Sequence, residues 1–189
     1  LGEIVLGPGA DASDPAAGGW ASTRPLLFVP GNHDIRGPRA RTLSQALTPW
    51  QSEADDPAGL PTAAWGGGRY CFALRHGPVA IVGLDTGEDK PDRRAVFAGL
   101  AAYEPYREAQ RDWLAQALQR PEIADAPHLV ALCHIPLNGL PGQPDGQEDE
   151  GYARYSGQGN ALWSPLLNDA GCALVISGHT HQFRIDAPA

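Results

Sequence analysis

Polar side chains that can bind metal ions follow three apolar segments of this sequence. The segments with their polar ends read "FVPGNHD", "LVALCHIPL" and "LVISGHTH". Imidazole, amide oxygen and carboxylate, without thiolate, are the ligand mix of hydrolytic Zn, Mn or Fe centres. The residue types therefore suit a hydrolytic metal site, provided that the fold brings the three segment ends together. The polar residues concerned are Asn32, His33, Asp34, His134, His179 and His181.

Each of the three patterns also has a plainer interpretation. "GNHD" fits an Asx-turn, "GHTH" fits a polar turn, and a single histidine at a strand end is most often packed or hydrogen-bonded. His179 and His181 are two residues apart, however, and on an extended chain such residues point the same way. The two imidazoles could then serve neighbouring metal ions.

The elements that would position these residues alternate between strand and helix. Short apolar runs bounded by proline or glycine are typical of strands buried on both faces, and an apolar stripe at helical spacing indicates an amphipathic helix. This alternation predicts an α/β layered fold, in which ligands bind beyond the carboxyl ends of the strands. We expect strands at 25–30 and 128–137, a hairpin over 69–85, a strand, turn and strand over 172–185, helices at 41–50, 104–121 and 161–171, and an acidic loop over 142–159.

The composition fits one domain spanning residues 1–189. The formal charge of -8 and the pI near 5.1 provide no basic surface for a long nucleic acid. No apolar window approaches the roughly 20 residues that cross a bilayer. Cys71, Cys133 and Cys172 are far apart and lie in or beside apolar runs, so we interpret them as small buried hydrophobes.

The motifs "GNHD", "HIPL" and "GHTH", in this order and each behind an apolar strand, resemble those of the calcineurin-like metallophosphoesterase superfamily. The resemblance covers nearly the whole chain. "LDTGEDKPD" and "YREAQRDWLAQAL" are similar to segments of bacterial members akin to purple acid phosphatases. The resemblance implies a layered α/β/β/α sandwich with two divalent or trivalent metal ions (Zn, Mn or Fe) at its mouth.

The resemblance also implies roles for individual residues. Asn32, His134 and His179 look like ligands of the second metal ion, and His181 looks like a ligand of the first. The implied activity is hydrolysis of phosphate mono- or diesters by in-line attack of a metal-bridging hydroxide on a small phosphoester substrate.

The remaining two residues of the "GNHD" turn have implied catalytic roles. His33 resembles the histidine that faces the leaving-group oxygen, and Asp34 would orient it and raise its pKa.

Five further residues have weaker claims on the site. Arg36 could clamp a phosphate or could be a solvated surface arginine, and Asp85 could orient a ligand histidine, although capping the next turn is the preferred interpretation. Lys90 is expected to be solvated. His76 and His128 are expected to be structural.

Two earlier motifs of the family are missing from this sequence. These are a GDxH-type turn and a GDxxD- or GDxxN-type turn whose aspartate bridges both metal ions. In the nearest candidate, "VLGPGAD", Pro8 stands in the place of the aspartate, and Asp11 and Asp14 are only distant substitutes. We therefore expect the chain to be the C-terminal part of the sandwich, to hold at most one metal ion weakly, and to show little turnover alone.

Two alternatives to a phosphatase stay open at this point. One is a nuclease or cyclic-nucleotide phosphodiesterase on the same scaffold, although the low pI disfavours long nucleic acids. The other is a noncatalytic scaffold or binding module, because a fold that lacks metal ligands can still bind partners.

Overall fold

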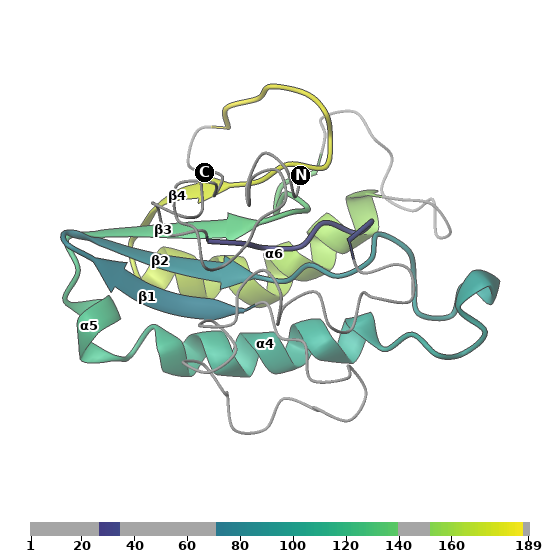
Figure 1. The fold of residues 1–189 in the computed structure, drawn as a ribbon, viewed down its shortest axis with the longest axis horizontal. Helices are drawn as coiled ribbons and strands as arrows, with labels where there is room; N and C mark the ends of the chain where they lie inside the picture. Colours follow the sequence, from purple (N-terminus) through teal and green to yellow (C-terminus); the bar gives the residue numbers. More distant parts are fainter. Residues whose placement is uncertain (1–26, 35–70, 140–151, 187–189) are drawn as a thin grey trace, which may run out of the picture.

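The computed structural model describes residues 27–34, 71–139 and 152–186, and within them it shows a mixed α/β fold (Figure 1). The strands are β1 (Phe72–His76), β2 (Val79–Leu84), β3 (His128–Cys133) and β4 (Cys172–Ile176). The helices are the 3-10 turn η3 (Ala95–Phe97), α4 (Tyr103–Ala117), α5 (Pro121–Ala124) and α6 (Tyr152–Asp169). None of the helices described is long and apolar enough to cross a membrane.

The four strands form one sheet in the order β1-β2-β3-β4. β1 and β2 pair antiparallel as the expected hairpin, whereas β2, β3 and β4 run parallel. Parallel neighbours need crossover connections, and these contain α4 and α5 before β3 and α6 before β4. The carboxyl ends of β2, β3 and β4 therefore meet at one edge of the sheet.

The hairpin depends on two glycines. Gly77 has a φ of +58° in the tight turn between β1 and β2, a conformation that glycine adopts without steric cost. Gly83 pairs with Phe72 across the ladder, and a Cβ at Gly83 would lie 2.1 Å from Cε1 of the Phe72 ring. The missing side chain thus makes the space in which the buried Phe72 ring lies.

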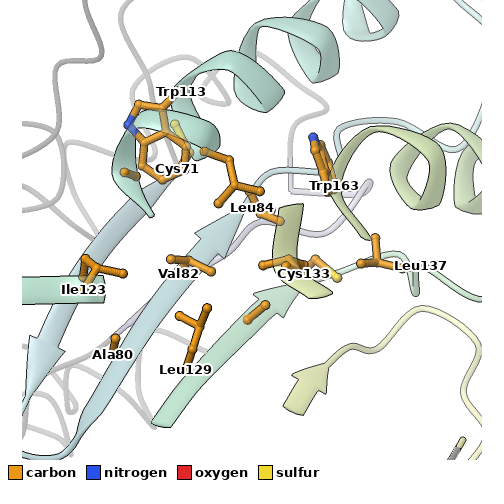
Figure 2. Packing of buried hydrophobic residues seen from close by; sticks show 14 of the residues in the cluster. Cys71, Ala80, Val82, Leu84, Trp113, Ile123, Leu129, Cys133, Leu137 and Trp163 are labelled. Atoms are coloured by element: carbon orange, nitrogen blue, oxygen red, sulfur yellow. The ribbon is translucent and has the colours of Figure 1, made fainter. Parts of the chain in front are cut away.

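The core lies between the sheet and the helices (Figure 2). β3 alternates between fully buried and less buried side chains, and β2 does so up to Val82, so one face of these strands is buried more deeply than the other. The sequence predicts strands buried on both faces. α4 contributes Trp113, Leu114 and Ala117, whose spacing places them on one stripe of the helix, as the sequence predicts. α6 packs beside α4 and adds Trp163 and Leu167 to the same cluster.

The loop before α4 is tied to the first turn of that helix. The backbone N–H groups of Tyr103 and Glu104 donate to the two carboxylate oxygens of Asp92, at 2.8 and 2.9 Å. These donors have no partner within a helix, so a carboxylate at this end both satisfies them and complements the helix dipole. Asp92 thereby fixes the end of the loop that begins after β2.

Three expectations from the sequence are wrong in the described residues. Residues 27–30 form no strand, and no strand follows the turn after β4 through residue 186. α6 begins at Tyr152, within the expected loop, because packing overrides the low helix propensity of its glycines. Gly159 lies against Leu137 and Trp163, where a larger residue would have less space.

Other expectations lie partly or wholly outside the described residues. The helix expected at 41–50, together with Arg36, Asp11 and Asp14, belongs to this group. The residues that the structure does describe form a single sheet layer, so the second sheet of the expected sandwich is not among them. Cys71 and Cys133 are buried and Cys172 is half-buried, and none of the three forms a disulfide.

Candidate metal centre

Three of the predicted ligands come together at the carboxyl edge of the sheet. Nε2 of His134 lies 3.2 Å from Oδ1 of Asn32 and 3.2 Å from Nδ1 of His179. The two imidazole rings meet edge to face, with their centroids 5.0 Å apart. These side chains come from three separate segments of the chain, so the cluster is a product of the tertiary fold.

The backbone geometry explains why glycine precedes the polar residues in "GNHD" and "GHTH". A Cβ on Gly31 would lie 3.0 Å from Cε1 of His134, so glycine allows the turn to approach the imidazole. Gly178 donates its N–H to the carbonyl of His134 at 2.9 Å, which joins the segment after β4 to the end of β3. His179 and His181 follow with φ of +68° and +54°. For residues with a side chain this left-handed region is strained, and such strain is concentrated at functional sites.

The hydrogen-bond pattern brings Oδ1 of Asn32 and Nδ1 of His179 to the same ring nitrogen, Nε2 of His134. Oδ1 of Asn32 can only accept, so Nε2 of His134 carries the proton that the two share. The same proton can point toward Nδ1 of His179 if that nitrogen is unprotonated. A cation in place of the proton would face Oδ1, Nε2 and Nδ1 together.

The spacing of these atoms fits such a cation. For metal–ligand distances of 2.0–2.2 Å in tetrahedral geometry, neighbouring ligand atoms lie about 3.4 Å apart. The two separations of 3.2 Å are close to this value. Among the described residues, no three side chains of His, Cys, Asp or Glu form a possible metal group, so the amide oxygen of Asn32 is needed as the third ligand.

The surroundings keep both imidazoles neutral, which is the form that binds metal ions. Burial is the main cause that lowers the pKa of His134, and the neighbouring His179 lowers it further. Burial also lowers the pKa of His179, against the opposing effect of Asp89.

A group of charged residues after β2 borders the cluster and was not predicted from the sequence. Nδ2 of Asn32 donates to Oε1 of the buried Glu88 over 3.5 Å, and Oδ2 of Asp89 lies 3.8 Å from Nε2 of His179. Lys90 is half-buried, with Nζ 2.8 Å from Oδ1 of Asp89 and 3.8 Å from Oε1 of Glu88. The expectation that Lys90 is solvated is therefore wrong.

The structure places His33 and Asp34 on the exposed side of the same turn. Asp34 closes the turn: its Oδ2 accepts from the N–H of Gly31 at 2.9 Å, and its own N–H donates to the carbonyl of Gly31 at 3.0 Å. His33 is near enough for its charge to lower the pKa of both His134 and His179. The catalytic roles of His33 and Asp34 stay predictions.

His181 is exposed and also influences His179 electrostatically. Its role as a ligand of another metal ion stays a prediction, as does the role of Arg36, which lies outside the described residues.

Asp85 is buried beneath the site and caps the following turn, as preferred from the sequence. Its Oδ1 accepts from the N–H of Gly87 at 2.9 Å, and the hydroxyl of Tyr106 donates to its Oδ2 at 3.3 Å. Burial raises the pKa of Asp85 to about 6, although both hydrogen bonds and the nearby charge of Arg107 oppose this shift. Asp85 supports the loop that carries Glu88 and Asp89.

Comparison with known families agrees with this arrangement. The family model of the calcineurin-like phosphoesterases matches residues 11–183. The chain therefore belongs to the calcineurin-like phosphoesterase family, whose members generally use divalent metal ions to hydrolyse phosphoesters. No curated protein and no solved structure matches the chain.

Proposed function

We propose that this chain takes part in metal-dependent hydrolysis of small phosphoesters, with a cation held by Asn32, His134 and His179. The observation that carries the proposal is the close approach of Oδ1 of Asn32 and of Nδ1 of His179 to Nε2 of His134, each at 3.2 Å. A bound cation would neutralise phosphate oxygens and lower the pKa of a water molecule. Zn, Mn and Fe all accept these nitrogen and oxygen donors.

His33 is proposed to donate a proton to the departing alkoxide. Two observations support this role: the residue is exposed, so that a substrate can reach it, and its charge acts on both clustered histidines. Asp34 follows it directly and closes the turn that presents it.

His181 is proposed as a ligand of a further metal ion. The three clustered ligands are all neutral, so a second cation nearby would be repelled unless more anionic ligands faced it. We therefore expect the 189-residue chain to bind at most one cation per molecule. The net charge of -8 favours small substrates over polyanions.

Calorimetric titration of the purified chain with Zn²⁺ and with Mn²⁺ tests the proposal. We expect one ion or fewer per molecule in the wild type, and at least a tenfold weaker affinity in His134→Ala. His128→Ala is the matched control, because His128 is exposed at the far end of the same strand. Equal affinities for the two variants would contradict the site, and two tightly bound ions would contradict the stoichiometry.

Hydrolysis of bis(nitrophenyl) phosphate by the metal-loaded chain provides the second part of the test. If turnover and metal affinity change in parallel from one variant to the next, the result supports a phosphoesterase. Tight metal binding at His134 without turnover on any phosphoester would favour the noncatalytic scaffold instead.

A further inference from the structure

The amide of Asn32 has two chemically different ends, and only one can bind a cation. The carbonyl oxygen Oδ1 faces His134, while Nδ2 faces the carboxylate of Glu88. If the amide were turned over, Oδ1 would face a carboxylate and the amino group would face the metal position, which is repulsive at both ends. Glu88 therefore selects the orientation in which Asn32 is a ligand.

His179 has an analogous choice between its two ring nitrogens. Nδ1 faces the cluster, and Nε2 faces Oδ2 of Asp89 at 3.8 Å, which is beyond a direct hydrogen bond but close enough for electrostatic attraction. A proton on Nε2 is favoured by the carboxylate and leaves the lone pair of Nδ1 free for a cation. Carboxylates beside metal-binding histidines have this effect on the tautomer.

The two carboxylates are held by a loop whose backbone is fixed from inside the protein. The buried Arg107 of α4 donates Nε to the carbonyl of Thr86 at 2.8 Å, Nη2 to the carbonyl of Glu88, and Nη1 to Oε1 of Gln158 in α6 at 2.8 Å. The guanidinium thus holds the backbone of Glu88 in place. The carboxylate oxygen Oε1 of Glu88 accepts from the N–H of Asp89 at 3.0 Å and also lies near Nδ2 of Asn32 and Nζ of Lys90.

Further hydrogen bonds join the loop after β2 to α4 on one side and to the segment after β3 on the other. The side chain of Gln110 donates to the carbonyl of Asp85 at 2.7 Å and accepts from its N–H at 2.8 Å. The N–H of Ile135, next to His134, donates to the hydroxyl of Thr86 at 3.3 Å. Gly87 has a φ of +65°, and a Cβ there would lie 2.7 Å from the ring of Tyr103. These contacts couple the position of the loop to the end of β3.

We propose that Glu88 and Asp89 are positioning residues, which orient Asn32 and His179 so that their Oδ1 and Nδ1 atoms face the cation; this inference rests on the proposed function. The pair also supplies negative charge beside three neutral ligands, which favours a cation over an empty site. Lys90 balances part of this charge through its contacts with both carboxylates.

Substitution of Glu88 in the full chain tests the role of its acceptor oxygen. Zn²⁺ affinity is expected to fall 10- to 100-fold in Glu88→Ala. It is expected to fall only about threefold in Glu88→Gln, whose amide oxygen can still accept from Asn32. Glu108→Gln, an exposed position on α4, is the matched control and should bind Zn²⁺ as the wild type does. Equal affinities in Glu88→Ala and Glu108→Gln would overturn the role of Glu88.

Lys90→Gln separates positioning from simple charge pairing. If Glu88 only balanced the charge of Lys90, removal of Lys90 would weaken Zn²⁺ binding as much as Glu88→Ala does. Under the proposal, removal of this positive charge leaves the affinity unchanged or raises it. Loss of affinity in Lys90→Gln equal to that in Glu88→Ala would overturn the proposal.

The tautomer of His179 in the metal-free chain gives a readout that does not depend on activity. Long-range ¹H–¹⁵N correlation spectra should show the proton on Nε2 in the wild type and a shift of the tautomer population toward Nδ1 in Asp89→Asn. An unchanged population would overturn the role of Asp89. If the tautomer shifts but the wild type binds no metal and hydrolyses no phosphoester, the proposed function fails and the positioning of His179 stands.

Discussion

Two regions of the sheet, the central strands β2 and β3 and the outermost described strand β4, both lead into the candidate site but differ in how deeply they are buried. Leu84 in β2 has no exposed surface and Leu129 in β3 is buried, whereas Leu174 and Ile176 of β4 are about half exposed, at 51% and 50%. His134 follows the well-buried strand β3, and His179 follows the half-exposed strand β4. The comparison indicates that one ligand is held by packing, whereas the other depends more on its contacts with His134 and Asp89.

The largest expected effect concerns chemistry on the exposed side of the site. His33→Ala in the metal-loaded protein should lower turnover of alkyl phosphoesters by roughly 10²- to 10⁴-fold, because an alkoxide leaves poorly without a proton. Nitrophenyl esters should be affected much less, since their leaving group needs no protonation. Steady-state kinetics on both substrate classes, with metal content measured alongside, checks the prediction. Equal losses on both classes would contradict the general-acid role.

A matched pair of leucine substitutions tests the contrast in packing. Leu84→Ala should lower the free energy of unfolding by about 2–5 kcal/mol, because it leaves a cavity in the core. Leu174→Ala should cost less than about 1 kcal/mol, since half of the side chain already contacts solvent. Urea unfolding of the two variants and the wild type measures both values. Similar losses would show that β4 is packed as tightly as β2.

A smaller effect follows from the buried carboxyl of Asp85. Its folded-state pKa of about 6 is above the unfolded value of 3.8, so the folded protein binds this proton more tightly. The resulting stabilisation is complete below about pH 4 and is lost as the pH rises through 6, by about 3 kcal/mol in total. Asp85→Asn has no titratable carboxyl group at this position, so its free energy of unfolding lacks this pH-dependent contribution.

Urea unfolding of the wild type and Asp85→Asn between pH 4 and pH 8 checks this sign. Relative to the wild type, the variant should become progressively more stable as the pH rises. Parallel pH profiles for the two proteins would contradict the prediction, because every other titrating group is common to both.

The parts of the fold and site that could be predicted depend on local patterns. The hairpin, α4, β3 and β4 follow from apolar periodicity and from proline and glycine at their ends. The positions of His134 and His179 follow from histidines beyond strand ends, whereas Asn32 follows a segment that forms no strand. Glu88 was missed because "GEDK" has the composition of a solvated loop. Glu88 is buried and its carbonyl accepts from Arg107, which lies on a helix further along the chain, and no local pattern encodes that contact.

The start of α6 shows the same limit. Gly157 and Gly159 suggest a loop by propensity, and the helix there depends on packing against Leu137 and on the hydrogen bond from Arg107 to Gln158. "LDTGEDKPD" does follow an apolar strand, as "HIPL" and "GHTH" do. The tendency of ligands to bind beyond the carboxyl ends of strands could therefore have indicated that this charged loop borders the site.

The most direct test is a crystal structure of the chain soaked with Zn²⁺, with anomalous diffraction to locate the metal. The arrangement of Asn32, His134 and His179 predicts one anomalous peak about 2.0–2.2 Å from Oδ1, Nε2 and Nδ1 of these residues. An anomalous peak at another position would contradict the candidate metal centre. So would a structure in which these three side chains point into separate regions.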